Sequence, residues 1–428
     1  MVTSEQIRDA IKKHKLELPR FQKLYNYYIG KHDILNRILP DPEKPNNKIV
    51  TDYAGTIIDT VVGYFASRPI SYISKTGNEQ YLNDLQEVLF LNDAEDNDAE
   101  IVKDFSIFGK CYEYMWVDQA GQIRFTEYSP LEMVVVKDRK DNIRFAFRYW
   151  TEKVNDKSFT KVELYNDVGI YYLVSDDGET FVPDPNEESK PHFFGEVPVS
   201  IYKNNDNEIG DFEKQIPMID QLDKLLSDSS NELESWVNAY LVLAGHKGTQ
   251  SDDIQKMKQD GVLLLDEVGQ AKFLTKDVNV NFQQNFFDTV DNLIHQQTAT
   301  PKLTSEEFSS NLSGIAIGFK LFGLESKSMI KERKMEKALR KRIRLITTIL
   351  NLKKNSSYSF ADIRFNFVRN LPQNEAEVTD QITKLVNLVD QETLLSWHPR
   401  IQEPAQIIKK LKEEEDSADL DSIGDENE

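Results

Sequence analysis

The sequence predicts an α+β protein, because two different hydrophobic periods occupy different parts of the chain. Apolar residues recur every three or four positions before residue 109 and again after residue 216, which is typical of amphipathic helices. Between residues 110 and 203 apolar and polar residues alternate, which is typical of half-buried strands. With 428 residues, of which 39% are hydrophobic, the chain is long enough to build several domains.

The first predicted helices lie within residues 4–66. The segment RFQKLYNYYIG has aromatic residues at helical spacing and closes on Gly30. The segment IVTDYAGTIIDTVVGYFASRP repeats apolar residues at the same spacing and stops at Pro69, which cannot continue a helix. NEQYLNDLQEVLFLND and DAEIVKDFSIFG predict two further helices.

The strands are predicted between residues 110 and 203. The alternating segments are CYEYMWVD, QIRFTEYS, MVVVKD, IRFAFRYW, KVELYND and IYYLVSDD. QAG, DRKDN and SDDGE separate some of them and favour turns, so the pattern predicts an antiparallel meander. The polar link KNNDNEIGDF then marks a boundary.

A long helix is predicted over residues 217–244, from Pro217 in its first turn to Gly245. Its apolar residues step by three and four, as one face of a buried helix or a coiled-coil seam does. Residues 260–278 predict a hairpin that turns at Val268, Gly269 and Gln270, and residues 282–297 predict a second helix.

The stretch SNLSGIAIGFKLFGLESKSMIKERKMEKALRKRIRLITTIL, residues 310–350, predicts a loop that leads into a helix of more than 30 residues. An apolar stripe runs along the helix and comprises Met335, Leu339, Ile343, Ile346 and Leu350. Gly314, Gly318 and Gly323 interrupt its start. Because glycine disfavours a helix interior, these three positions predict a hinge, a close packing contact or a conversion between loop and helix. A strand-like SYSFADIRFNFVRN and a helical region, 374–412, follow.

Charge is segregated along the chain, whose net charge is −20. Residues 320–344 hold ten Lys and Arg against three Glu, whereas residues 413–428 hold nine carboxylates and no cation, which predicts a disordered tail. The basic helix could be a solvated face, could pair with acidic helices of the same or a neighbouring subunit, or could face phosphate. The acidic candidates on residues 217–244 are Asp220, Asp223, Asp228, Glu232 and Glu234.

No catalytic constellation is recognisable. FGKCYEY lacks the glycine-rich lead of a phosphate loop, and the six histidines are scattered without metal-binding spacing. We therefore expect no enzyme activity, no cofactor and no metal site. No apolar run is long enough for a membrane span, no secretory signal is seen, and the single cysteine, Cys111, fits a reducing compartment such as the cytoplasm.

Five segments in order carry a resemblance that covers nearly the whole chain. They are YNYYIGKHDIL with NNKIVTDYAGTIIDTVVGYFASRPISY, FGKCYEYMWVDQAGQIRFTEYSP, IDQLDKLLSDSSNELESWVNAYLVLAG, EEFSSNLSGIAIGFKLFGLESKSMIKERKMEKALRKRI, and LPQNEAEVTDQITKLVNLVDQETLLSWHPRIQEPAQIIKKL. In these segments the chain resembles the portal proteins of tailed bacteriophages, in the siphophage-type branch.

The resemblance implies a portal fold with an α/β wing, a two-helix stem, a small α/β clip and a helical crown. The ranges it implies are 1–210 for the wing, 211–245 and 281–298 for the stem helices, 246–280 for the clip, 299–314 for the tunnel loop, 315–370 for a long kinked helix with a returning wing strand, 371–412 for the crown and 413–428 for the acidic tail. The implied tunnel-loop residues are Lys302, Thr304, Glu306, Glu307, Ser309, Ser310, Asn311 and Ser313.

The family also implies a homo-oligomeric ring, usually of twelve subunits, at one capsid vertex of the virion, assembled in the host cytoplasm. Double-stranded DNA would pass through its channel without sequence specificity. Terminase, the major capsid or scaffolding protein and a head–tail adaptor would be its partners, and no membrane is implied. A closed ring needs two complementary patches on each subunit, for which the expected candidates are Asp220, Asp223, Asp228, Glu232, Lys337, Arg340 and Lys341.

Three rival interpretations stay open at this point. A nucleic-acid-binding regulator would use the helix 327–344 to grip duplex DNA as a monomer or dimer. An unrecognised hydrolase would hold a buried acid–base site. A helical scaffold or minor head protein would lack a pore.

Overall fold

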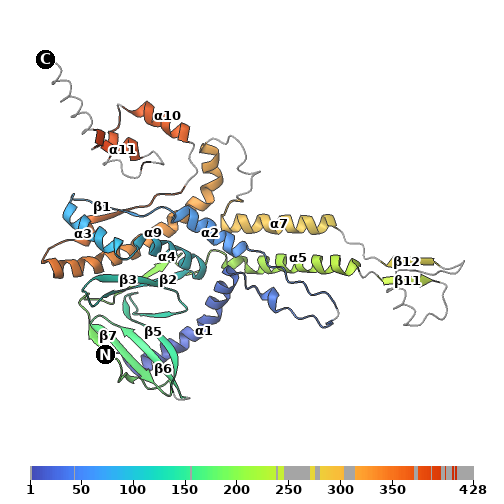
Figure 1. The fold of residues 1–428 in the computed structure, drawn as a ribbon, viewed down its shortest axis with the longest axis horizontal. Helices are drawn as coiled ribbons and strands as arrows, with labels where there is room; N and C mark the ends of the chain where they lie inside the picture. The colour runs from blue at the N-terminus through green and yellow to red at the C-terminus, as the bar shows by residue number, and fades with distance from the viewer. Residues whose placement is uncertain are drawn as a thin grey trace, which may run out of the picture. The chain divides into compact units, whose positions relative to one another are not determined.

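The computed structural model of the chain describes residues 2–42, 44–154, 157–237, 240–244, 270–274, 280–302, 314–370, 375–386 and 388–396, and positions 401, 407–408 and 410–411 (Figure 1). The chain divides into two compact units. One comprises residues 1–301 and 323–368, and the other comprises residues 302–322 and 369–428. The mixture of helices and strands confirms the α+β prediction.

Four helices form the amino-terminal part, as the sequence predicted. They are α1 (Ser4–Tyr28), α2 (Tyr53–Phe65), α3 (Glu79–Phe90) and α4 (Ala94–Phe108). Side chains cap three of them: Thr3 and Gln6 form a capping box on α1, Asp52 accepts from Gly55 N–H, and Asn78 accepts from Tyr81 N–H. A short 3-10 helix, η1 (Asp33–Asn36), follows α1.

The strands between residues 110 and 203 form two sheets rather than one meander. The first sheet has the order β10-β2-β3, with β2 (Lys110–Val117), β3 (Ile123–Tyr128) and β10 (Val199–Lys203). The second contains β4 (Met133–Lys137), β5 (Ile143–Val154), β6 (Lys157–Tyr165), β7 (Gly169–Ser175) and β8 (Val182–Pro183), and β9 (Lys190–Pro191) also pairs with β7.

The division between the two sheets lies at Ser129 and Pro130. Glu132 N–H donates to the Ser129 carbonyl at 3.1 Å, which closes a turn, and Pro130 within that turn has no N–H to continue a ladder. Strand β10 then pairs antiparallel with β2, with Ile201 opposite Tyr112. The prediction of alternating strands was therefore correct, but the simple meander was wrong.

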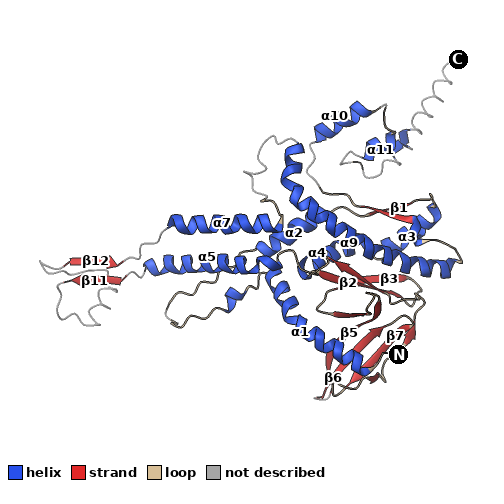
Figure 2. Ribbon diagram, turned by 180° about the vertical axis from the view of Figure 1, so that it is seen from behind, coloured by secondary structure: helices blue, strands red, loops and turns tan. Residues whose placement is uncertain are grey.

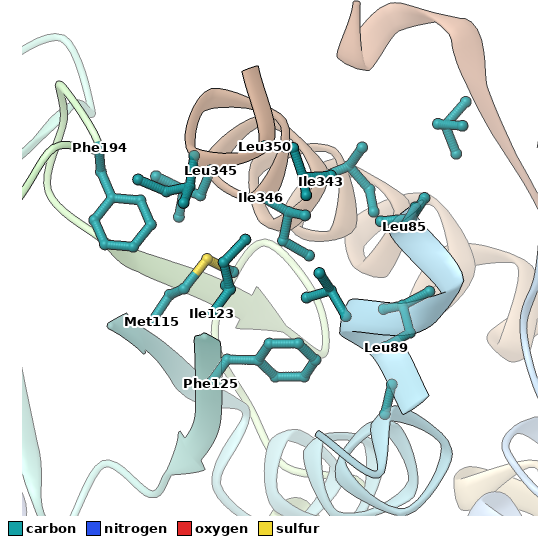
Figure 3. Close-up of a cluster of buried hydrophobic side chains, with 14 of the residues drawn as sticks. Leu85, Leu89, Met115, Ile123, Phe125, Phe194, Ile343, Leu345, Ile346 and Leu350 are labelled. Atoms are coloured by element: carbon teal, nitrogen blue, oxygen red, sulfur yellow. The ribbon is translucent and has the colours of Figure 1, made fainter. Parts of the chain in front are cut away.

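The basic helix of the sequence is α9 (Gly314–Lys354), at 41 residues longer than predicted. All five members of its predicted apolar stripe are buried. Figure 3 shows Ile343, Ile346 and Leu350 of this stripe packed in a core with Leu85 and Leu89 of α3, and strands β2 and β3 supply further side chains from the other side. Strand β13 (Ile363–Asn366) returns from α9 and pairs antiparallel with β1 (Ser71–Ser74).

Helices α5 (Ile216–Val237) and α7 (Val280–Thr298) lie side by side in Figures 1 and 2. Near their roots, Ile219 and Leu222 of α5 share a buried core with Val290 and Ile294 of α7. The 3-10 helix η2 (Glu213–Gln215) leads into α5.

The long-helix prediction for residues 217–244 was partly wrong. Helix α5 ends at Val237, and residues 240–244 form β11 (Tyr240–Ala244), which pairs antiparallel with β12 (Gln270–Leu274). The YLVLA segment is apolar throughout and therefore suits a strand as well as a helix. Gln270 accordingly lies in a strand and not in the predicted turn.

The second unit contains two further described helices, α10 (Glu375–Leu385) and α11 (Gln391–Ser396). Both fall within the region predicted to be helical. Among the residues that the structure describes, no helix combines the length and the apolar character needed to cross a membrane.

Candidate functional site at the roots of α5, α7 and α9

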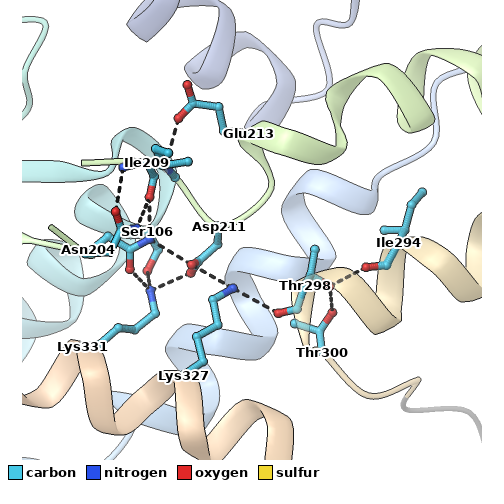
Figure 4. Close-up of polar contacts among 12 residues, drawn as sticks. Ser106, Asn204, Ile209, Asp211, Glu213, Ile294, Thr298, Thr300, Lys327 and Lys331 are labelled. Atoms are coloured by element: carbon cyan, nitrogen blue, oxygen red, sulfur yellow. Dashed lines mark hydrogen bonds and ion pairs between the residues drawn. The ribbon is translucent and has the colours of Figure 1, made fainter. Parts of the chain in front are cut away.

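A buried polar junction joins α9 to the segments that lead into α5 and out of α7 (Figure 4). Its centre is Lys331 of α9, only 1% exposed, whose Nζ donates to Asp211 Oδ2 at 2.6 Å and to Ser106 Oγ of α4 at 2.9 Å. Nζ also donates to Asn204 Oδ1. Three acceptors thus surround one ammonium, which satisfies all three of its protons.

Lys327, one helical turn before Lys331, extends the junction to α7. Its Nζ lies 2.9 Å from Asp211 Oδ1 and donates to the backbone carbonyl of Thr298 at 3.1 Å. Thr298 is the last residue of α7, and its hydroxyl bonds to the hydroxyl of Thr300 at 2.6 Å. The carboxylate of Asp211 therefore connects two turns of α9 with the start of α5 and the end of α7.

The two partners at the centre of the junction respond differently to burial, which lowers the pKa of Lys331 to about 8 against the attraction of Asp211. Burial alone would raise the pKa of the Asp211 carboxyl, but the charges of Lys331 and Lys327 outweigh this effect and hold the pKa well below its ordinary value. A second carboxyl just before it behaves similarly. Burial opposes the shift, but hydrogen bonds from Lys110 and Lys203 lower the pKa of Glu208 to about 2.

Two glycines allow the segment that carries Asp211 to lie against the end of α4. A Cβ at Gly109 would meet the Glu208 carbonyl oxygen at 2.1 Å, and a Cβ at Gly210 would meet the Ile107 carbonyl oxygen at the same distance. Gly109 also has φ +87°, which favours glycine. The backbone of this segment can therefore reach Lys331 only because these two positions lack a side chain.

We expect Gly109→Ala to lower the free energy of unfolding by several kcal/mol, because it adds both a positive-φ penalty and a backbone clash. Gly121→Ala is the matched control, because Gly121 has φ +74° with open space around it. It should cost only about 1 kcal/mol. Urea denaturation of both variants measures the difference, and equal losses would contradict the close approach.

A second buried ion cluster fixes the middle of α9. Arg342 is fully buried and forms a two-point contact with Glu113 of β2, in which Nε donates to Oε2 at 3.0 Å and Nη2 donates to Oε1 at 2.5 Å. Nη2 also lies 2.6 Å from Asp98 Oδ1 of α4. Tyr202 O–H donates to the same Glu113 carboxylate at 3.2 Å.

The basic segment is therefore largely neutralised within its own chain. Seven of its ten cations form ion pairs with carboxylates of this chain: Lys327 and Lys331 with Asp211, Lys334 with Asp206, Arg340 with Glu336, Lys341 and Arg344 with Glu196, and Arg342 with Asp98 and Glu113. The sequence left open whether these cations are solvated, pair with carboxylates or face phosphate. In the structure these seven pair with carboxylates of the same chain. None of these carboxylates lies on α5.

Three carboxylates of α5 instead contact the end of α1 and the segment that follows it. Asp223 is fully buried, with Oδ2 2.6 Å from His32 Nδ1 and Oδ1 accepting from Thr51. Asp220 accepts from Tyr27 O–H, and Asp228 lies 2.6 Å from Arg37. Because Asp223 is enclosed within one chain, it cannot contact a neighbouring chain, which corrects its place among the expected interface residues.

A sequence model of the family described as "Phage portal protein, SPP1 Gp6-like" matches residues 7–420. The chain belongs to this family of phage portal proteins. It is 23% identical over 403 residues to the portal protein of Bacillus phage SPP1, covering 90% of this chain and 79% of the relative. It is 21% identical over 454 residues to the portal protein of Clostridium phage phiCD119, covering 96% of each.

A solved structure titled "Neck of empty GTA particle computed with C6 symmetry" contains a chain with a TM-score of 0.47 and 10% identity to this portal protein. The match covers 80% of this chain and 89% of that chain. The family resemblance predicted from the five segments is confirmed by the family match and the two portal relatives. Portal proteins are structural proteins, and a ring-shaped channel and DNA packaging are typical of the family. The portal relatives imply that this chain is located at the portal of the virion.

The three predicted hinge glycines of this portal subunit have different surroundings. A Cβ at Gly323 would lie 3.2 Å from the Cβ of Ala299, just after α7, so this glycine permits close packing of α9 on that segment. A Cβ at Gly318 would meet nothing within 4 Å. Gly314 is the first residue of α9. Bending at these positions stays a prediction.

The predicted tunnel-loop residues lie mostly outside the described residues. These are Thr304, Glu306, Glu307, Ser309, Ser310, Asn311 and Ser313, whereas Lys302 is described and partly buried. The sequence did not reveal the junction residues Ser106, Asn204 and Asp211. They carry no motif, and only the glycine next to Asp211 signals an unusual backbone.

Proposed function

We propose that this portal subunit closes with further copies into a ring around a central channel for double-stranded DNA. Residues 1–210 with roughly 330–370 would form the wing, helices α5 and α7 the stem, and residues 246–280 the clip. Residues 299–314 would line the channel as the tunnel loop, and residues 371–412 would form the crown. The side-by-side packing of α5 and α7 on a shared core supports the stem assignment.

The proposed subunit acts without catalysis and without a cofactor. It would pass DNA during packaging and ejection, bind terminase and later a head–tail adaptor, and contact the major capsid or scaffolding protein. Assembly would take place in the host cytoplasm, at one vertex of the capsid. Membership of the portal family, whose model matches residues 7–420, is the observation that carries this proposal.

The ion pairs that the α9 cations form with carboxylates of their own chain favour a DNA channel rather than a DNA-binding regulator. A protein that grips duplex DNA presents unpaired cations to the phosphates, and each neutralised phosphate steepens the salt dependence. Here seven of the ten cations between residues 320 and 344 already contact carboxylates of their own chain. Together with the net charge of −20, this arrangement favours weak contact with DNA.

The test is duplex binding by the purified full chain at several salt concentrations. We expect dissociation constants no tighter than about 10⁻⁴ to 10⁻⁶ M near physiological salt, with no dependence on sequence. Nanomolar binding by a monomer or dimer, with a steep salt slope, would favour the regulator and contradict the DNA channel.

A further inference from the structure

A cavity of about 600 Å³ lies between one face of α9 and the strands that cover it. Five of its cations come from α9, namely Lys334, Lys337, Arg340, Lys341 and Arg344. Two more, Lys137 and Lys203, come from β4 and β10. We call it the basic cavity. All of its lining belongs to the larger unit, residues 1–301 with 323–368.

Most cations of the basic cavity form ion pairs within the chain, but the lining holds seven cations against three carboxylates, Asp141, Glu196 and Asp206, so its net charge stays positive. Arg344 forms a two-point contact with Glu196 at 2.6 and 2.8 Å, which leaves Lys341 at 3.6 Å from the same carboxylate. Burial and the charge of Arg344 lower the pKa of Lys341 to about 8, against the attraction of Glu196. Lys337 is exposed and no ion pair to it is seen among the described residues, although its charge contributes to the lowered pKa values of Asp141 and Asp206 in the same cavity. An added carboxylate would therefore be stabilised here.

The walls of the cavity show which class of anion fits. Ile143, Val197, Ile201 and Phe360 line it beside the cations, and Phe360 is 38% exposed. A phosphate backbone would leave these apolar groups in contact with polar atoms or water. A protein segment with both carboxylates and an apolar side chain matches cations and apolar walls together, so the lining favours an acidic protein segment over nucleic acid.

Such a segment projects from the same chain at the corner between α3 and α4. Phe90, the last residue of α3, is 83% exposed. Asp93, Glu95 and Asp96 follow within six residues, and all three are exposed. Asp93 has φ +46°, a left-handed conformation that turns the chain sharply between the two helices. We call residues 90–96 the acidic corner.

The acidic corner and the basic cavity belong to opposite sides of α9. Leu85 and Leu89 of α3 pack on Ile343 and Ile346. Lys341 lines the cavity two positions before Ile343, and two positions on a helix correspond to a rotation of about 200°. One chain therefore presents two different and complementary patches on opposite sides, as a closed ring of identical subunits requires.

We propose that the acidic corner of one portal subunit docks into the basic cavity of the next subunit in the ring. The carboxylates of Asp93, Glu95 and Asp96 would approach Lys337, Arg340 and Lys341, and the Phe90 ring would cover the apolar wall. This contact rests on the proposed ring. In this contact the acidic corner, and not the carboxylates of α5, is the partner of the α9 cations.

Charge reversal on the full chain tests the contact. Lys337→Glu with Arg340→Glu should raise the concentration at which half the protein is assembled by about tenfold or more, because like charges would then face each other. Glu95→Lys with Asp96→Lys should act in the same way. The four substitutions combined restore complementarity, so this variant should assemble nearly as well as the natural protein.

The matched control is Lys12→Glu with Lys13→Glu, which makes the same charge change at exposed positions of α1. Circular dichroism checks that each variant is folded, and mass photometry measures assembly. Rings unaffected by reversal, or impaired rings that the combined variant does not restore, would overturn the docking proposal. If the natural chain forms no rings, the proposed function fails before this contact is tested.

Cross-linking gives an independent measurement. Cys111 is the only cysteine and is buried, so background labelling should be low. The variant with Lys337→Cys and Glu95→Cys, treated with a short bismaleimide, should give a ladder of covalent multimers. Either substitution alone should not give a ladder. Absence of a ladder from assembled rings of the double variant would contradict the proposal, and a duplex that protects the thiol introduced at position 337 from labelling would indicate a nucleic-acid site instead.

Discussion

Replacement of Lys331 by methionine is expected to lower the free energy of unfolding by about 3–5 kcal/mol, one of the two largest effects that we expect. Methionine keeps most of the side-chain volume but removes the ammonium that contacts Asp211, Asn204 and Ser106. Asp211 stays buried with only Lys327 as a cationic partner. The urea midpoint, followed by circular dichroism, measures the loss.

Two variants separate this effect from a general loss of charge on α9. Lys334→Met removes a lysine three residues further along, whose partner Asp206 is 83% exposed in its side chain. It should cost less than about 1 kcal/mol. Adding Asp211→Asn to Lys331→Met should recover part of the stability, because the uncompensated charge is then removed. Equal losses for Lys331→Met and Lys334→Met would contradict the buried junction.

Arg342→Leu is expected to lower the free energy of unfolding by a similar amount, about 3–5 kcal/mol. The substitution leaves Glu113 and Asp98 buried side by side without a cation. Arg342→Lys should restore little, because an ammonium cannot reproduce the two parallel hydrogen bonds to Glu113. Thermal unfolding and urea midpoints of both variants measure these losses.

The control for this prediction is Arg340→Leu, two positions before Arg342. Arg340 is 61% exposed in its side chain and pairs with Glu336 of its own helix, so its loss should cost less than about 1 kcal/mol. A stability loss at Arg342 no larger than at Arg340 would show that the cluster does not hold α9 against β2 and α4.

Short-range patterns in the sequence predicted the helices and most strands well. The stripe Met335, Leu339 and Ile343 has helical spacing and is buried as expected, because a single periodic signal determines which face of α9 meets the core. The helix end at Gly30 was also predicted, and this residue has φ +74°. Membership of the portal family followed from the order of five segments.

Longer-range features could not be predicted in the same way. Lys331 and Asp211 lie 120 residues apart in the chain, and no local pattern indicates that they meet. Asp223 is indistinguishable in sequence from an exposed helix carboxylate, yet it is enclosed by His32 and Thr51. Residues 240–244 form an apolar run that is compatible with either a helix or a strand. Only its pairing with strand 270–274 shows which of the two forms.

Negative-stain electron microscopy of the purified full chain tests the central claim most directly. We predict closed rings of many subunits with a central hole, whatever their exact number, because a portal subunit conducts DNA only as part of an annulus. A sample that stays a compact monomer across the accessible concentrations, with no annular particles in any class average, would contradict the account.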